Sequence, residues 1–281
     1  MNNQLPIAPP TMQRARGTLR VAMRLRDGRT VLDDLYQEGC LKARMPRPVD
    51  WTEIVLLNSS GGVAGGDRLD VTVSLAAGAQ ACVTAQAAER FYRALDGTAP
   101  SMVCNTLHIG PDARLEWLPQ ETILFDRSAL TRSLDIDLAE GAGFLGVEML
   151  VFGRQAMGES VRQLALSDTI RVRREGMLIW HDGLRFAGDP HTVLARRAIG
   201  GGTMAVASLL MVGDDATALL PVLRDTLSAF EDDAVESGVS ALDGLLTARI
   251  LAPTSAALRK AVIAGLDVLR CGRALPRVWN C

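Results

Sequence analysis

The sequence predicts a mainly β protein, a sandwich, barrel or solenoid of many short strands, with two α-helices in its C-terminal third. In several segments, apolar and polar residues alternate with the two-residue period of a strand that is buried on one face. Turn signals such as Asp27-Gly28 and Gly110-Pro111-Asp112 separate these segments. Near the C-terminus the apolar residues instead take helical spacing.

The predicted strands follow one another along the first half of the chain. Residues 18–26 form the first strand, and residues 29–32 return from the hairpin turn that follows it. The same alternation predicts further strands over residues 69–75, 103–109, 113–117 and 130–138. Residues 144–152 are apolar on both faces except at Glu148, which is typical of a central strand.

Two helices are predicted after these strands. Asp214 or Asp215 is positioned to cap the first helix, and Pro221 is expected in its first turn. The apolar residues of that helix are Leu219, Val222, Leu223, Leu227 and Phe230. Thr254 or Ser255 is expected to cap the second helix. Its apolar stripe consists of Leu258, Ala261, Val262 and Leu269.

Composition and spacing exclude several classes of protein. A net charge of -2 and a pI near 6.0 do not fit a nucleic-acid-binding protein. Apolar runs are too short for a membrane span, and five widely spaced cysteines favour a reduced, cytoplasmic setting. The chain lacks a phosphate-binding P-loop, a Gly-x-Ser-x-Gly elbow and a His-Glu-x-x-His motif. We expect one domain over residues 1–281, with residues 1–16 as a flexible N-terminal segment.

A glycine-rich motif at residues 58–67 contains four glycines and ends in Asp67. The glycines are Gly61, Gly62, Gly65 and Gly66. They permit positive φ angles and expose backbone N–H groups, so the motif can form an anion-binding nest. Alternatively, the Asp67 carboxylate accepts hydrogen bonds from those N–H groups and closes a tight turn.

Acidic residues occur in two further motifs. Glu116, Glu121 and Asp126 lie within residues 115–126, where they are either solvated loop acids or a catalytic carboxylate pair. Glu148 lies among apolar neighbours in residues 147–159. A buried carboxylate needs a partner or a proton, so Glu148 is either ion-paired, with Arg154 as the candidate, or a functional acid.

These motifs, together with residues 84–93 containing Tyr92 and Arg93, resemble the UreD family of urease accessory proteins, also called UreH. Segments 39–44, 181–186, 245–249 and 276–279 extend the resemblance over nearly the whole chain. It implies a β-helix-like stack of sheets with two C-terminal helices and no enzymatic activity. Such proteins bind UreF, recruit the GTPase UreG and dock on apo-urease in a dimeric hetero-oligomer.

The resemblance also implies that nickel(II) crosses the protein in transit through a water-filled passage, without a tightly bound cofactor. By position in the matching motifs, the expected path residues are Asp67, Glu148 and Asp182, with Glu121 and Glu159 as second choices. The four glycines, Tyr92, Arg93 and Arg154 are expected in structural or partner-binding roles. Two alternatives are a weak nickel-storage protein, which the three dispersed histidines His108, His181 and His191 disfavour, and a β-helical carbohydrate-active enzyme.

Overall fold

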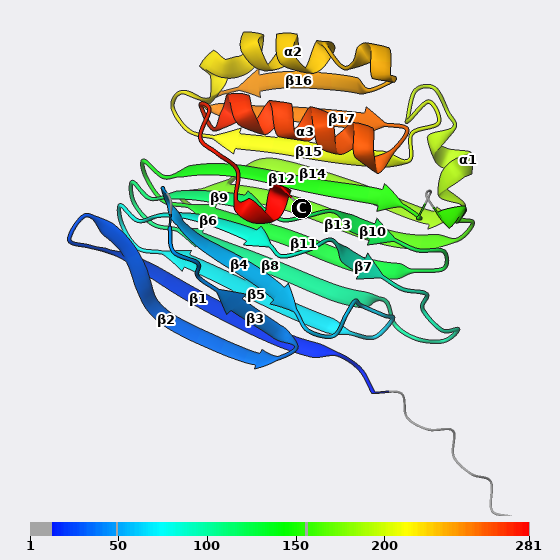
Figure 1. Ribbon diagram of the computed structural model, residues 1–281, viewed down its shortest axis with the longest axis horizontal. Helices are drawn as coiled ribbons and strands as arrows, with labels where there is room; N and C mark the ends of the chain where they lie inside the picture. The colour runs from blue at the N-terminus through cyan, green and yellow to red at the C-terminus, as the bar shows by residue number, and fades with distance from the viewer. Residues whose placement is uncertain (1–12, 49, 155–156, 281) are drawn as a thin grey trace, which may run out of the picture.

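The computed structural model describes residues 13–48, 50–154 and 157–280, and it arranges their strands in two facing sheets (Figure 1). The seven-stranded sheet has the order β14-β13-β11-β8-β5-β1-β2. Its strands are β1 (Arg16–Arg26), β2 (Arg29–Gly39), β5 (Arg68–Leu75), β8 (Ser101–Ile109), β11 (Ala129–Leu138), β13 (Leu164–Arg174) and β14 (Met177–Gly188).

The second sheet has ten strands among the described residues. Its main path runs β16-β17-β15-β12-β9-β6-β4-β3, with β10 paired to β12 and β7. These strands are β3 (Leu41–Arg44), β4 (Thr52–Asn58), β6 (Gln80–Ala85), β7 (Glu89–Phe91), β9 (Arg114–Leu118), β10 (Thr122–Leu124), β12 (Gly143–Phe152), β15 (Ala205–Val212), β16 (Glu236–Leu242) and β17 (Leu245–Ala252).

The chain winds between the sheets as a β-helix does. Strands β5, β8, β11 and β13 pair in parallel in one sheet, and β4, β6, β9 and β12 pair in parallel in the other. Each coil therefore contributes one strand to each sheet. Antiparallel strands β14 and β15 end this parallel stack, and β17 and β16 extend the ten-stranded sheet.

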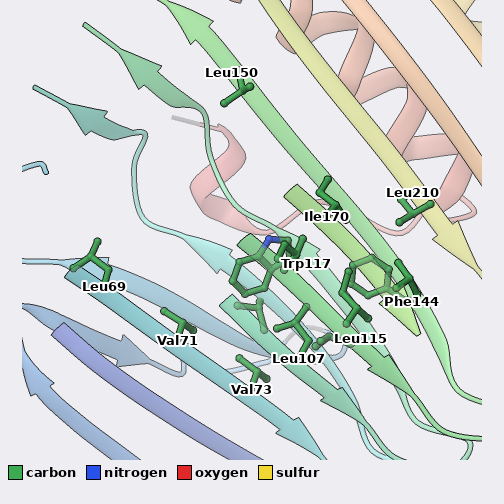
Figure 2. Packing of buried hydrophobic residues seen from close by; sticks show 14 of the residues in the cluster. Leu69, Val71, Val73, Leu107, Leu115, Trp117, Phe144, Leu150, Ile170 and Leu210 are labelled. Carbon is green, nitrogen blue, oxygen red and sulfur yellow. The ribbon is translucent and has the colours of Figure 1, made fainter. Parts of the chain in front are cut away.

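Two apolar layers hold the fold together. One fills the space between the sheets, where Trp117, Phe144 and Ile170 lie among the labelled residues of Figure 2. The other lies between the outer face of the ten-stranded sheet and the helices α2 (Leu220–Ser228) and α3 (Ser255–Leu269). Figure 1 shows these helices beside β15, β16 and β17. Because β12 lies between the layers, all ten of its residues are buried.

The predicted mainly β fold with C-terminal helices is confirmed, as is the central position of residues 144–152. Asp27 and Gly28 both have positive φ angles in the β1–β2 turn, as a tight hairpin requires. Pro221 lies in the first turn of α2, and the Thr254 side chain caps α3. Among the described residues, no helix is long and apolar enough to cross a membrane.

Several boundaries differ from the prediction. The return strand β2 is longer than residues 29–32, and Asp215 precedes a short 3-10 helix, Ala216–Leu219, without capping it through its side chain. A short helix, α1 (Pro190–Leu194), was not predicted. Residues 1–12 of the expected flexible segment lie outside the described residues, and Arg16 at its end already belongs to β1.

Candidate cation passage

A group of charged side chains interrupts the apolar core between the sheets. Arg132 of β11 donates two hydrogen bonds to Asp168 of the neighbouring β13, at 2.8 and 2.6 Å. Its Nη1 atom also lies 2.6 Å from Oε2 of Glu148, on β12 of the opposite sheet. All three side chains are at most 8% exposed. The charged group therefore bridges the two sheets inside the core.

The strand register explains why these residues meet. Alternate residues of β12, including Phe144 and Leu150, point into the space between the sheets, and Glu148 follows the same alternation. Arg132 pairs directly with Asp168 in the parallel register of β11 and β13. Arg132, Asp168 and Glu148 are therefore inward-facing residues of adjacent or facing strands that lie at the same height along the strands.

Two uncharged groups complete the hydrogen bonding. The indole Nε1 of Trp117 donates to Oε1 of Glu148 at 2.8 Å, and Nη1 of Arg132 donates to the Thr122 hydroxyl at 2.9 Å. Both carboxylate oxygens of Glu148 therefore have partners. A buried ion pair is stable only when its hydrogen-bonding groups are satisfied in this way.

Burial and charge act in opposite directions on this group. Burial raises the pKa of Glu148, and the nearby Asp168 carboxylate adds to that rise, although the Arg132 charge opposes both. Burial alone would lower the pKa of Arg132, but the Asp168 and Glu148 carboxylates raise it further, so the guanidinium stays charged. With both acids ionised, the group carries one net negative charge inside the protein.

A second ion pair lies beside the first. Asp182 of β14 accepts a hydrogen bond of 2.5 Å from Arg249 of β17, again across the two sheets. In the ten-stranded sheet, Glu148, Ser208 and Arg249 are direct neighbours in register. This pair is less buried, because the side chain of Asp182 is 20% exposed and that of Arg249 is 33% exposed.

Two cavities meet at Glu148. The larger, of about 240 Å³, has the exposed residues Gly61 and Arg90 at one end and the buried residues Trp117, Arg132 and Glu148 at the other. The smaller, of about 10 Å³, is close to the space of one water molecule. It is lined in part by Glu148, Asp168, Asp182, Ser208 and Arg249. The two cavities, with the Glu148–Arg132–Asp168 group between them, form a candidate passage between the sheets.

Of the carboxylates expected on the path, the structure brings Glu148 and Asp182 to this passage. Asp67 accepts hydrogen bonds from the backbone N–H groups of Ala64 and Ala15, at 2.7 and 2.9 Å, and so closes the glycine-rich turn. Glu121 pairs with Arg259 of α3 at 2.7 Å, on the outer side of the ten-stranded sheet.

The predicted pairing of Glu148 with Arg154 is wrong. Arg154 instead lies 2.9 Å from Glu159, whose carboxylate also accepts the backbone N–H groups of Arg154 and Asp126. The physical reason is the strand direction: Arg154 follows β12 beyond Phe152, whereas Glu148 faces β11 across the core. Arg154 thus pairs with Glu159 beyond the end of β12, and its guanidinium carbon lies 4.4 Å from the Phe125 ring centroid.

The glycine motif and Tyr92 form one unit. Gly61, Gly62 and Gly66 have positive φ angles, and a Cβ atom on Gly62 would overlap the Tyr92 ring. The Tyr92 hydroxyl donates to the Gly61 carbonyl at 3.1 Å. Gly65 is constrained as well, because a Cβ atom there would lie 2.7 Å from Cβ of Ala94. Arg93 contributes a β-bridge to Ser128.

The remaining acids of residues 115–126 do not form an open carboxylate pair. Glu116 is 1% exposed and pairs with Arg270 and Arg273 from the C-terminal segment. Asp126 accepts hydrogen bonds from the backbone N–H groups of residues 162 and 163. Within residues 13–48, 50–154 and 157–280, no group of three or more His, Cys, Asp and Glu side chains is arranged to hold a metal ion.

Sequence reasoning missed Arg132, Asp168 and Arg249, which form the ion pairs with Glu148 and Asp182 where the two cavities meet. The alternation of residues 130–138 could have identified Arg132, because this residue shares the inward face of its strand with Leu130 and Leu134. A charged residue at an inward position of an alternating strand must find a partner inside the core. Asp168 occupies the equivalent position between Leu166 and Ile170.

Comparison with known proteins gives matches over almost the whole chain. The model of the UreD urease accessory protein family matches residues 15–280. The urease accessory protein UreD of Rhizobium leguminosarum bv. trifolii is 45% identical over 269 residues, which cover 95% of this chain and 96% of that protein. UreD of Dinoroseobacter shibae is 46% identical over 275 residues, covering 96% and 94%. UreD of Chelativorans sp. is 42% identical over 276 residues, covering 97% and 96%.

Proposed function

The chain belongs to the UreD family of urease accessory proteins, and on this basis we propose that it passes nickel(II) to apo-urease through the passage between its sheets. Family membership gives it a role in urease maturation as an accessory protein and not as an enzyme. The family that the sequence motifs indicated is thereby confirmed. The route of the metal is the part that we propose.

The observation that carries the proposal is the line of carboxylates inside the β stack. Glu89, Glu148, Asp168 and Asp182 contribute four negative charges to the two cavities, and Arg90, Arg132 and Arg249 contribute three positive charges. The passage is therefore negative overall when its acids are ionised. A buried negative region attracts a cation more strongly than the same charges would in water.

The chemistry of the lining suits transit better than storage. The polar side chains that line the two cavities are carboxylates, hydroxyls, amides, guanidinium groups and an indole, whereas tight sites for nickel use clustered imidazole or thiolate ligands. Conduction requires successive sites that bind an ion weakly enough to release it. Oxygen ligands separated along two adjoining cavities meet this requirement.

We further propose that the chain acts within an assembly of accessory proteins in the cytoplasm. UreF is the expected direct partner, and UreG supplies the GTP hydrolysis for which this chain has no P-loop. The assembly would dock on the urease apoprotein as a dimeric hetero-oligomer. The support for these partners is the family and its role in urease maturation.

Co-expression with urease subunits and the other accessory proteins tests the proposal. Nickel per urease is measured by elemental analysis for the wild-type chain, for no chain, and for the Asp182→Asn variant. We expect assembled but nickel-poor urease without the chain, and reduced nickel with Asp182→Asn although the complex still forms. Asp135→Asn is the matched control, because Asp135 pairs with Arg171 on the same sheet but not at the passage. Full nickel occupancy without the chain would disprove the proposed function.

A further inference from the structure

We infer that the Arg132 guanidinium is a resident cation that closes the passage at rest and gives way to an arriving divalent ion. The inference rests on the proposed function, because it assigns a gate to the same passage. Arg132 lines the inner end of the larger cavity, and its partner Asp168 lines the smaller one. Glu148 lines both cavities. The guanidinium therefore lies at the junction that a travelling ion must cross.

The contacts of Arg132 are those of a cation held by oxygen ligands. Its Nε and Nη2 atoms donate to Asp168, and its Nη1 atom contacts Glu148 and the Thr122 hydroxyl. All four contacts end on oxygen. Carboxylate and hydroxyl oxygens are also ligands for divalent metal ions. The guanidinium thus occupies the ligands that such an ion would need at this point.

Charge balance gives the exchange a direction. With Arg132 in place, the two carboxylates of Glu148 and Asp168 face one positive charge, and one negative charge remains unbalanced. A divalent ion in the same position would neutralise both carboxylates, and the displaced Arg132 guanidinium, which keeps its charge, must then be solvated in the larger cavity, where the exposed residues Gly61 and Arg90 lie. Since an unbalanced buried charge is unfavourable, a divalent ion has an advantage over the guanidinium that a monovalent ion lacks.

The structure also offers space for the displaced side chain. The cavity of about 240 Å³ adjoins Arg132 on the side away from the smaller cavity. Arginine has a long side chain with several rotatable bonds, so its guanidinium can move into this cavity without a change of backbone. Arg132 then acts as a positioning residue, which keeps Glu148 and Asp168 ready and keeps the passage shut when no divalent ion is present.

Equilibrium dialysis of the purified full-length chain against nickel chloride tests the gate without urease. In Arg132→Gln the two carboxylates lose their resident cation, so this variant should bind about one nickel per chain roughly tenfold more tightly than the wild type. Arg132→Gln combined with Asp168→Asn restores the original charge balance and should lose the added binding. Nickel should raise the Tm of Arg132→Gln and leave that of the double variant unchanged.

A purely structural ion pair predicts a different result. Arg132→Gln would then be destabilised and the double variant would recover stability, but neither would gain nickel binding, and that outcome would overturn the gate. If Arg132→Gln does not fold, Arg132→Lys replaces it, because lysine keeps the charge but loses the two-point contact with Asp168. Arg132→Lys should bind nickel more tightly than the wild type, and wild-type binding in this variant would equally overturn the gate.

The two proposals fail separately. Full nickel occupancy of urease without the chain removes the proposed function but leaves the dialysis result in place. Unchanged nickel binding by the Arg132 variants removes the gate but leaves transit through the passage in place.

Discussion

Arg132 contacts Glu148 across the two sheets, with Nη1 lying 2.6 Å from Oε2, although neither side chain is more than 8% exposed. The two residues come from β11 and β12, which are consecutive in sequence but belong to opposite sheets. Together with the neighbouring Asp182–Arg249 pair, this contact joins the two sheets through charge inside a largely apolar core. It also determines how the passage responds to mutation and to pH.

Truncation of Glu148 should be strongly destabilising. In Glu148→Ala, Arg132 keeps Asp168 but loses one ionic partner, and Trp117 loses its acceptor. Removing one member of a buried pair costs about 3–5 kcal/mol, so the free energy of unfolding in urea should fall by that order. Asp33→Ala is the control: Asp33 pairs with Arg24 at the surface, and its loss should cost at most about 1 kcal/mol. Equal effects of the two variants would contradict the buried pair.

The indole of Trp117 should matter for its hydrogen bond as well as for its volume. Trp117→Phe removes the Nε1 donor at 2.8 Å from Glu148, and hydrogen bonds to charged groups contribute about 1.5–3 kcal/mol. We expect a loss of at least that size in urea unfolding. Trp51→Phe is a matched control, since Trp51 stacks under the Arg273 guanidinium and is less buried. If Trp117→Phe is no less stable than Trp51→Phe, the hydrogen bond to Glu148 is not important for stability.

Glu148 should make stability fall as the pH rises. Burial, opposed by Arg132, holds the pKa of Glu148 above its ordinary value of 4.5. Between the unfolded and folded pKa values, the folded protein binds a proton that the unfolded chain has lost, so stability decreases as the pH rises through the folded pKa. The difference in free energy of unfolding between the wild type and Glu148→Gln should therefore decrease over this interval.

Asp135 provides a control, because its contribution to stability should change with pH in the opposite direction. The hydrogen bond from Arg171 lowers the pKa of Asp135 below its ordinary value of 3.8, so its contribution is present above that pH and is lost as the pH falls through the folded pKa. The difference between the wild type and Asp135→Asn should therefore increase with pH in the acidic range. Urea titrations at several pH values measure the two differences in free energy of unfolding. If both differences changed with pH in the same direction, the opposite pKa shifts of Glu148 and Asp135 would be contradicted.

Arg270 should hold the C-terminal segment on the ten-stranded sheet. It pairs with the buried Glu116 at 3.0 Å and also donates to the carbonyls of Arg273 and Ala274. Arg270→Ala should leave Glu116 with Arg273 alone and release residues 271–280, which we expect to exchange their amide hydrogens faster. Lys260→Ala, at an exposed position of α3, should leave this exchange unchanged. Unaltered exchange in Arg270→Ala would show that apolar contacts alone hold the segment.

Much of the fold could be predicted because its signals are local. The alternation in residues 130–138 follows from one buried face, and the φ angles of Asp27 and Gly28 follow from a two-residue hairpin. The glycine motif offers Asp67 as the cap of its own turn, and Asp67 accepts a hydrogen bond from the Ala64 N–H group. The short helix at residues 190–194 was missed, because a single turn is too short for a periodic apolar pattern.

The sequence by itself determined seven of the strands, which of these lies at the centre, and that Glu148 would need a partner or a proton there. Only the tertiary structure decided that this partner is Arg132 and not Arg154. The physical reason is that a buried charge is matched across the sheets: β11 faces β12 from the other sheet, and the parallel register of β11 and β13 places Asp168 beside Arg132. The distance along the chain does not predict which residues face each other across the sheets. The residues of the passage could therefore be identified only from the stacked coils of the tertiary structure.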